Sequence, residues 1–234
     1  MSTVSGLWRG VFVALVAGLV TTTCACAFRP ASFDLSAVRK QSDLEVVEVP
    51  GSVREKDGVT LRELRYTSTV WDGGVARPVR IQAFLATRAD KTDERKPGVI
   101  FAHGLGGQAD PQTAIELCRN IDVVALVLSG PGLGGSEGTP VTPENPRVLF
   151  SDGKDIRTSW MYGYVYAILR GITVLETRPE VDPQAIALTG FSLGGVATFI
   201  ANGVDDRIRG ALPMAATGGM AQAAQEDTWM RILL

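Results

Sequence analysis

The sequence predicts an α/β fold with a mostly parallel sheet, and three observations indicate it. Residues 59–70 (VTLRELRYTSTV) alternate between apolar and polar side chains, and residues 78–87 (PVRIQAFLAT) resume the alternation after a turn signal. From residue 97 onward, short apolar runs are separated by helical stretches, which is typical of strand–helix–strand units. A serine between two glycines, in ALTGFSLGGVATF at residues 187–199, lies between such an apolar run and the next predicted helix.

The composition is that of an ordinary globular domain. The chain has 234 residues, of which 45% are hydrophobic and 21% charged, and its formal net charge is −2. This is enough apolar material for a sizeable core. The near-neutral balance provides no basic stripe that could bind a phosphate backbone, so we expect no nucleic-acid partner.

Residues 1–27 differ from the rest of the chain. Arg9 is their only charged residue, residues 11–20 form an apolar run, and Ala-Cys-Ala at residues 25–27 fits the small-x-small pattern of a signal-peptidase site. We predict an export signal peptide that is cleaved after Ala27, and therefore a secreted or periplasmic protein. A membrane-spanning helix is not expected, because it needs about 20 apolar residues.

The cysteines leave one alternative open for the N-terminus. Cys24 or Cys26 could be the lipidated residue of a bacterial lipoprotein, which would anchor the protein to a membrane, although the residues before each match a lipobox poorly. Removal of the signal would leave Cys118 as the remaining cysteine, with no partner for a disulfide or a metal site. We interpret Cys118 as a small buried residue on a helix.

The other elements follow in chain order. Residues 28–56 are mixed and charged without a clear period, and we interpret them as a leader segment that packs on or trails from a domain at 57–234. A hairpin with its turn at residues 71–74 opens that domain. The subsequent elements are predicted as a strand at 99–102, a helix at 111–120, a strand at 123–128, a Gly/Pro-rich loop at 129–146, a helix at 159–177, a strand at 186–189, a helix at 193–202 and a strand at 208–214.

The helix at 159–177 has the clearest helical period. Its apolar face comprises Tyr162, Val165, Tyr166, Leu169, Ile172 and Thr173. Residues at this spacing lie on one side of a helix, so we interpret the aromatic stripe as core packing and not as a ligand site.

Ser192 is the candidate nucleophile. In a G-x-S-x-G pattern between a strand and a helix, the serine occupies a sharp turn, and Gly190 and Gly194 remove the side chains that would otherwise collide. The hydroxyl would then lie at the N-terminus of the next helix, where free N–H groups favour a developing negative charge. The alternative is a plain turn in which Ser192 caps the helix.

Three motifs occur in a defined order along the chain. His103-Gly104 follows one predicted strand, SGPGLGGSEG at 129–138 follows the next, and GFSLG at 190–194 follows the third. In these motifs the sequence resembles the α/β-hydrolase superfamily, over about residues 57–220. The segment at 160–182 looks most like the branch of acetyl xylan esterases, dienelactone hydrolases and prolyl oligopeptidases. The resemblance implies an α/β-hydrolase fold.

The resemblance also implies roles for the site residues. Ser192 would attack the acyl carbon, the N–H of Leu193 would be one oxyanion donor, and the N–H of Leu105 would be the other. In the superfamily the acid and the catalytic histidine follow the nucleophile in the chain. His103, with Gly104, is therefore expected to shape the oxyanion loop, and a role as the base stays open only if its ring reaches Ser192 Oγ.

Four carboxylates follow Ser192, namely Asp205, Asp206, Glu226 and Asp227. The first two fall in a helix-to-strand turn, at the sheet edge opposite the expected active site. The last two lie in what resembles the start of a lid or cap helix. Since none is a convincing catalytic acid, we expect a hydrolase domain that is incomplete at its C-terminus, with the acid and the histidine beyond Leu234 and little activity of its own.

These observations predict a serine hydrolase that acts on carboxylic esters, either small-molecule or carbohydrate esters, through an acyl-enzyme. The resemblance implies no metal and no organic cofactor. Two alternatives are a serine peptidase of the prolyl-oligopeptidase type, which is disfavoured because no propeller domain precedes the catalytic region, and a non-catalytic binding protein. A third is a dinucleotide site, because residues 130–135 match G-x-G-x-x-G, but the prolines that follow oppose the helix such a site needs.

Overall fold

The structure is a computed structural model that describes residues 33–90, 94–142, 145–150 and 155–218. The predicted export signal, the two candidate lipidation cysteines, and the carboxylates Glu226 and Asp227 lie outside these ranges. They stay sequence predictions.

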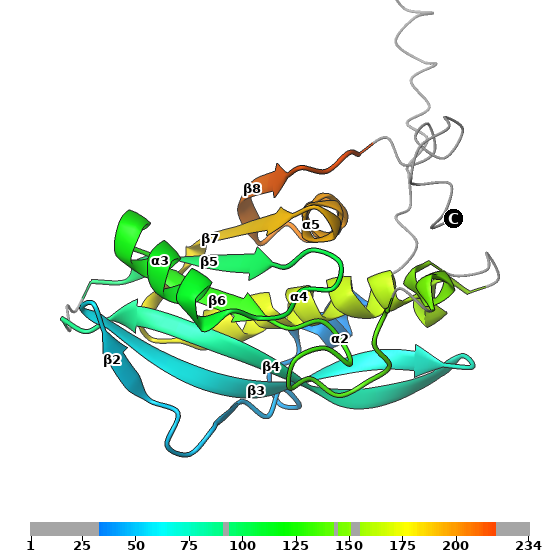
Figure 1. Cartoon of the computed structure of the whole chain (residues 1–234), viewed down its shortest axis with the longest axis horizontal. Helices are drawn as coiled ribbons and strands as arrows, with labels where there is room; N and C mark the ends of the chain where they lie inside the picture. Colours follow the sequence, from blue (N-terminus) through cyan, green and yellow to red (C-terminus); the bar gives the residue numbers. More distant parts are fainter. Residues whose placement is uncertain (1–32, 91–93, 143–144, 151–154, 219–234) are drawn as a thin grey trace, which may run out of the picture. The chain divides into compact units, whose positions relative to one another are not determined.

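The described chain is built on one eight-stranded sheet, shown in Figure 1. Its strands run in the order β1-β3-β4-β6-β5-β7-β8, and β2 pairs with β3 beside this path. The strands are β1 (Val47–Glu48), β2 (Arg54–Lys56), β3 (Val59–Asp72), β4 (Val75–Arg88), β5 (Lys96–Ala102), β6 (Val124–Leu128), β7 (Val181–Phe191) and β8 (Ile208–Met214). The pairs among β6, β5, β7 and β8 are parallel, whereas β1 to β4 pair antiparallel. The predicted α/β architecture, with an N-terminal hairpin before a parallel core, is confirmed.

The hairpin is longer than predicted. Pairing between β3 and β4 runs without interruption from Val59 opposite Arg88 to Asp72 opposite Val75. Gly73 and Gly74 form the turn alone, and both have positive φ angles, 57° and 83°. A two-residue turn with this backbone follows the natural twist of the strands, so pairing continues to the tip. The second strand consequently begins at Val75 and not at Pro78.

Helices cover both faces of the sheet. The helices are α2 (Leu35–Arg39), α3 (Pro111–Ile121), α4 (Trp160–Glu176) and α5 (Leu193–Val204), with short 3-10 turns at Pro146–Leu149 and Ile156–Thr158. Strand β6 shows how the faces divide: Leu126 and Leu128 pack into the core beneath α2, α4 and α5, whereas Ala125 and Val127 pack against α3. This alternation follows from the two-residue period of a strand.

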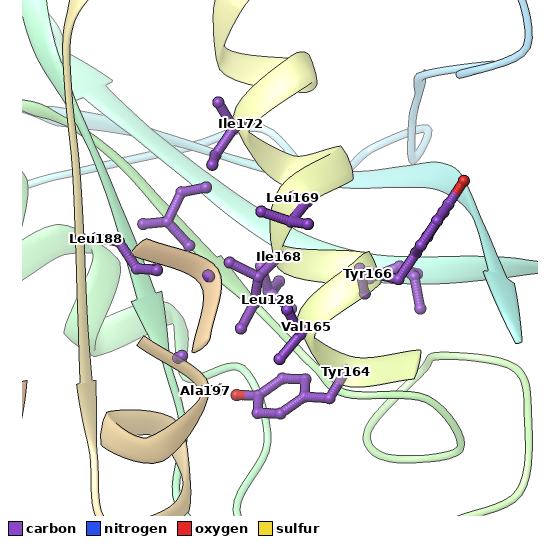
Figure 2. Close-up of a cluster of buried hydrophobic side chains, with 14 of the residues drawn as sticks. Leu128, Tyr164, Val165, Tyr166, Ile168, Leu169, Ile172, Leu188 and Ala197 are labelled. Carbon is purple, nitrogen blue, oxygen red and sulfur yellow. The ribbon is translucent and has the colours of Figure 1, made fainter. Parts of the chain in front are cut away.

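Helix α4 is the centre of the larger core. The predicted apolar stripe is buried, which confirms its interpretation as core, but burial extends around the whole helix from Trp160 to Leu175. Figure 2 shows its side chains directed both toward Leu128 and Leu188 and, at Tyr166, in the other direction, where the ring packs on Trp71 of β3. The helix is enclosed because α2, α5 and the hairpin each contact it. No helix in the described ranges is both long and apolar enough to cross a membrane.

The described part of the predicted leader segment packs on the domain. Val38 in α2 and Leu44 are buried in the same core as α4. The guanidinium of Arg170, on α4, donates to the backbone oxygen of Val38 at 3.0 Å and to the carboxylate of Asp43 at 2.9 Å. In residues 33–56 the absence of a clear period is explained by this short helix and by two brief strands, which are held by contacts with residues outside the segment.

Candidate active site

Ser192 is the single residue between strand β7 and helix α5. Its φ and ψ angles are 54° and −117°, a combination that non-glycine residues rarely adopt. The Ser192 N–H donates to the carbonyl of Met214 at the end of β8, at 2.9 Å, and the N–H of Val196 donates to the Ser192 carbonyl at 3.0 Å. These bonds hold a strained backbone in place, which is a feature of functional turns.

The glycines around Ser192 permit close contacts between backbones. A Cβ atom at Gly194 would lie 2.0 Å from the carbonyl oxygen of Ala102, at the end of β5. A Cβ atom at Gly190 would lie 2.4 Å from the carbonyl oxygen of Gly194. Both distances are far below van der Waals contact, so only glycine allows α5 to begin this close to the sheet.

The Ser192 hydroxyl does not cap the helix that follows it. The side chain is partly exposed and makes no capping bond to α5. The alternative of a plain capping serine is therefore wrong. Leu193 and Gly194 begin the helix directly after it, so N–H groups without helical partners lie beside the hydroxyl. Such a helix start favours negative charge.

The loop at residues 103–107, which follows β5, lies against this turn. A Cβ atom at Gly104 would lie 3.5 Å from Ser192 Cβ and 3.2 Å from the carbonyl oxygen of Phe191. The Gly107 N–H donates to the Gly104 carbonyl at 3.0 Å and closes the loop as a tight turn. Leu105, the predicted second oxyanion donor, lies within this turn and is 48% exposed. The structure thus brings together the two segments that were predicted to act on one substrate.

His103 is buried and bonded to backbone on both sides of its ring. Nε2 accepts a hydrogen bond from the N–H of Gly130 at 2.9 Å, and Nδ1 lies 2.7 Å from the carbonyl oxygen of Gly104. The first contact makes Nε2 an acceptor, so we assign the ring proton to Nδ1. Burial lowers the pKa of His103, and the hydrogen bond to Gly104 opposes this shift only in part. Neither nitrogen is left for the Ser192 hydroxyl, which argues against the alternative of His103 as the base.

The glycine-rich loop at residues 129–138 has a structural role and no nucleotide-binding geometry. The Ser129 hydroxyl accepts from the N–H of Ala109 at 2.9 Å. A Cβ atom at Gly132, where φ is 72°, would lie 2.3 Å from the nitrogen of Pro140. No helix begins anywhere in residues 130–142, whereas a dinucleotide fingerprint requires one at its last glycine. The loop therefore lacks the helix on which the dinucleotide alternative depends.

The described carboxylates after Ser192 lie at the far end of α5. Asp205 ends that helix and is buried, and Arg207 donates to it at 2.7 Å and Arg39 at 3.0 Å. Burial opposes the ionisation of Asp205, but the hydrogen bonds from Arg207 and Arg39 outweigh it, so its pKa is lowered. Asp206 is exposed and pairs with Arg39. Twelve helical residues separate this end from Ser192, a distance of about 18 Å.

Other cavities and reactive groups among the described residues lie away from Ser192. One cavity of about 330 Å³ lies at the Asp206 end of the sheet and is lined by Arg39, Glu176 and Arg207 among others, and not by Ser192. Cys118 is buried on α3, as predicted, and burial raises its pKa to about 11. No cluster of three or more potential metal ligands occurs in the part of the chain that the structure describes.

Sequence reasoning missed two kinds of residue at this site. Phe191, the residue before Ser192, is 53% exposed and adds an apolar surface beside it. Trp160 and Tyr164 contact the loops around the site through their polar atoms. A helical period identifies the buried side of a helix, but it carries no information about which backbone oxygen an aromatic N–H or O–H will reach.

Comparison with solved structures defines the fold. The chain is similar to an acetyl xylan esterase from Paenibacillus sp. R4, with a TM-score of 0.59 and 18% identity over 82% of this chain and 60% of that one. It is also similar to acetyl xylan esterase 1 from Thermoanaerobacterium sp. JW/SL YS485, with a TM-score of 0.57 and 17% identity over 75% of this chain and 54% of that one.

Sequence comparison finds shorter matches, and no family model matches the chain. Thiohydrolase apmlB from Arthrinium phaeospermum is 34% identical over 87 residues, which is 37% of this chain and 24% of that protein. A putative HTH-type transcriptional regulatory protein from Natronomonas pharaonis is 35% identical over 113 residues, which is 48% of this chain and 32% of that protein. The chain thus spans less than two thirds of each of these relatives.

The sheet order, the helices on both faces and the turn at Ser192 define an α/β protein with its candidate site at the carboxyl edge of parallel strands. More specifically, the chain has the α/β-hydrolase fold. The resemblance inferred from the three sequence motifs is confirmed at the level of the fold.

Proposed function

We propose that this protein is a serine hydrolase that acts on carboxylic esters, with Ser192 as its nucleophile. The observation that carries the proposal is the strained turn at Ser192, which presents a hydroxyl without a capping bond beside the start of α5. The fold shared with two acetyl xylan esterases supports an ester as the substrate, and a small-molecule or carbohydrate ester is the class we favour.

The geometry supports a defined sequence of steps. Ser192 Oγ attacks the ester carbonyl carbon while a general base takes its proton and later gives it to the leaving alcohol, and the carbonyl oxygen becomes an oxyanion. The N–H groups of Leu193, at the start of α5, and of Leu105, in the loop against Ser192, stabilise that charge. The alcohol then leaves with a proton, and water hydrolyses the acyl-enzyme to release the acid and restore Ser192.

The proposal requires a general base that the described residues do not supply. His103 is the only histidine of the sequence, and backbone groups occupy both of its ring nitrogens. Asp205 and Asp206 lie at the opposite end of α5. The proposal therefore places the base outside the described residues. Without it, only the contribution of the oxyanion donors and of binding remains, and activity is strongly reduced.

The site of action is proposed from the N-terminal sequence. Residues 1–27 would direct export, which places the hydrolase in the secreted or periplasmic space, or on a membrane if Cys24 or Cys26 is lipidated. Mass spectrometry of the N-terminus of the protein recovered from its native compartment separates these forms.

Replacement of Ser192 tests the function. We expect Ser192→Ala to reduce hydrolysis of p-nitrophenyl acetate to the background rate and to abolish labelling by a fluorophosphonate probe. Ser68→Ala is the matched control, because Ser68 is a buried serine whose hydroxyl has no hydrogen-bond partner among the described residues. Unchanged hydrolysis in Ser192→Ala would refute the proposal. Because a protein without its general base would also escape labelling, absence of labelling favours the non-catalytic binding protein only when the base is present. Cleavage of a prolyl p-nitroanilide would favour the peptidase.

A further inference from the structure

Two aromatic residues at the start of α4 each bond to one loop at the candidate site. The Tyr164 hydroxyl donates to the backbone oxygen of His103 at 3.1 Å, and the Trp160 indole N–H donates to the backbone oxygen of Pro131 at 2.8 Å. The two residues are four apart, so they share one face of the helix. His103 follows β5 and Pro131 follows β6, which are the strands that deliver the two loops.

Packing leaves these side chains little freedom. The ring centroids of Trp160 and Tyr164 are 4.7 Å apart, and those of Tyr164 and His103 are 5.0 Å apart. A Cβ atom at Gly130 would lie 2.4 Å from Trp160 Cζ2, so the loop backbone rests on the indole. Figure 2 shows Tyr164 reaching from α4 toward the side of Ala197 in α5, whereas Tyr166 points the other way.

The hydrogen bond from Tyr164 restrains the backbone of His103, whose ring is already bonded at both nitrogens. The imidazole already contacts Gly130 and Gly104 through its two nitrogens, and the Tyr164 hydroxyl holds the carbonyl of the same residue. That carbonyl also faces α5, since a Cβ atom at Gly194 would lie 2.6 Å from it. These contacts restrain the peptide that joins His103 to Gly104, beside the Ser192 turn.

We propose that Tyr164 is a positioning residue. Its hydroxyl donates a hydrogen bond to the peptide between His103 and Gly104. This bond fixes the position of the next N–H, that of Leu105, relative to Ser192. Its part in catalysis rests on the proposed hydrolase function, whereas its part in loop position does not. Tyr164 is fully buried, and burial raises the pKa of its hydroxyl well above the usual value. The hydroxyl consequently remains a donor at physiological pH.

A pair of tyrosine variants tests this inference. Tyr164→Phe keeps the ring and removes the hydroxyl. Tyr66→Phe is the matched control, because Tyr66 is equally buried and its hydroxyl donates at 2.8 Å to the carbonyl of Ala167, which belongs to helix α4 and not to a loop. Each variant loses one buried hydrogen bond, so similar decreases in melting temperature are expected.

The first readout is hydrogen exchange at two amides. Gly107 N–H bonds to Gly104, and Gly130 N–H bonds to the His103 ring, so both report the position of the loop. We expect at least tenfold faster exchange at these amides in Tyr164→Phe and no comparable change in Tyr66→Phe. Equal exchange in the two variants would overturn the inference, whether or not the protein hydrolyses esters.

The second readout is ester hydrolysis. Loss of an oxyanion donor reduces kcat by about 100-fold to 1000-fold, so a displaced donor is expected to reduce kcat by roughly tenfold with little change in KM. Tyr66→Phe should retain the wild-type kcat. A normal kcat in Tyr164→Phe would refute the catalytic part of the inference. Absence of hydrolysis in a wild-type protein that contains the general base would refute the proposed function, and the exchange comparison would still decide whether Tyr164 holds the loop.

Discussion

At the scale of single residues, the ring of His103 links two loops by hydrogen bonds. Its two ring nitrogens bond to backbone groups of its own loop and of the next, at Gly104 and Gly130. The ring can make both bonds only in the neutral form, because a protonated imidazole has no acceptor nitrogen for the Gly130 N–H. Protonation of His103 should therefore oppose the native structure.

This role predicts a pH dependence of stability. The native pKa of His103 is lowered by burial, whereas an unfolded histidine has a pKa of about 6.5. At pH values between the native and the unfolded pKa, the unfolded chain binds more protons than the native protein does. The free energy of unfolding is therefore highest above about pH 6.5 and falls as the pH decreases toward the native pKa. Urea unfolding at pH 7.5 and pH 5.5 should show the lower free energy of unfolding at pH 5.5.

Two measurements identify His103 as the source. Because the sequence contains one histidine, its Hε1 signal in a proton NMR titration is unambiguous and should report a pKa below about 6.5. His103→Gln should lower stability at both pH values and remove most of the difference between them. A wild-type protein equally stable at both pH values would contradict the expectation.

At the scale of elements, the junction of β7 with α5 depends on close backbone contact. Gly194→Ala places a Cβ atom 2.0 Å from the Ala102 carbonyl oxygen. The atoms involved are backbone and cannot rotate away, so we expect a loss of about 3 kcal/mol or more in the free energy of unfolding, at the upper end of overpacking effects. Chemical denaturation measures the loss.

Gly203 provides the matched control in the same helix. A Cβ atom at Gly203 meets nothing within 4 Å, and alanine is the better helix former by about 0.5–1 kcal/mol. Gly203→Ala should therefore leave stability unchanged or raise it slightly. If both variants behave alike, close approach to β5 is not the reason for glycine at position 194.

At the scale of the whole molecule, Arg170 joins segments that are distant in sequence. Its side chain is 3% exposed. It donates to the carbonyls of Ala37 and Val38 at the end of α2, to that of Thr67 in β3, and to the carboxylate of Asp43. A buried cation with these partners holds the first described residues against α4 and the hairpin.

Replacement of Arg170 should detach that segment. Arg170→Met leaves several carbonyl oxygens without a donor, and we expect a loss of about 3 kcal/mol in the free energy of unfolding, because each unsatisfied buried group costs about 1–3 kcal/mol. Limited proteolysis should show faster cleavage near residues 33–45. Arg178→Met is the control, since Arg178 is more exposed and its side chain pairs with Glu180; its loss should be at most about 1 kcal/mol. Equal losses would refute this role of Arg170.

Much of the molecule was predictable from local patterns in the sequence. The alternation in residues 59–70 predicted β3, and the apolar runs predicted β5 to β8, because burial of a strand face depends on a two-residue spacing. The pattern GFSLG predicted the turn at Ser192, since glycine spacing reflects backbone collisions. Hairpin length was underestimated, because Gly73 and Gly74 allow pairing to continue where the apolar alternation has ended.

The sequence by itself determined the order of strands and helices, the glycine turn at Ser192 and the resemblance in fold, since each depends on residue type at short spacing. Only the tertiary structure decided that both nitrogens of His103 are occupied, that Tyr164 reaches its carbonyl, and that Arg170 binds the segment before the hairpin. These bonds join residues up to 133 positions apart. Strand register and helix packing determine which of these residues meet, and no local sequence pattern encodes either.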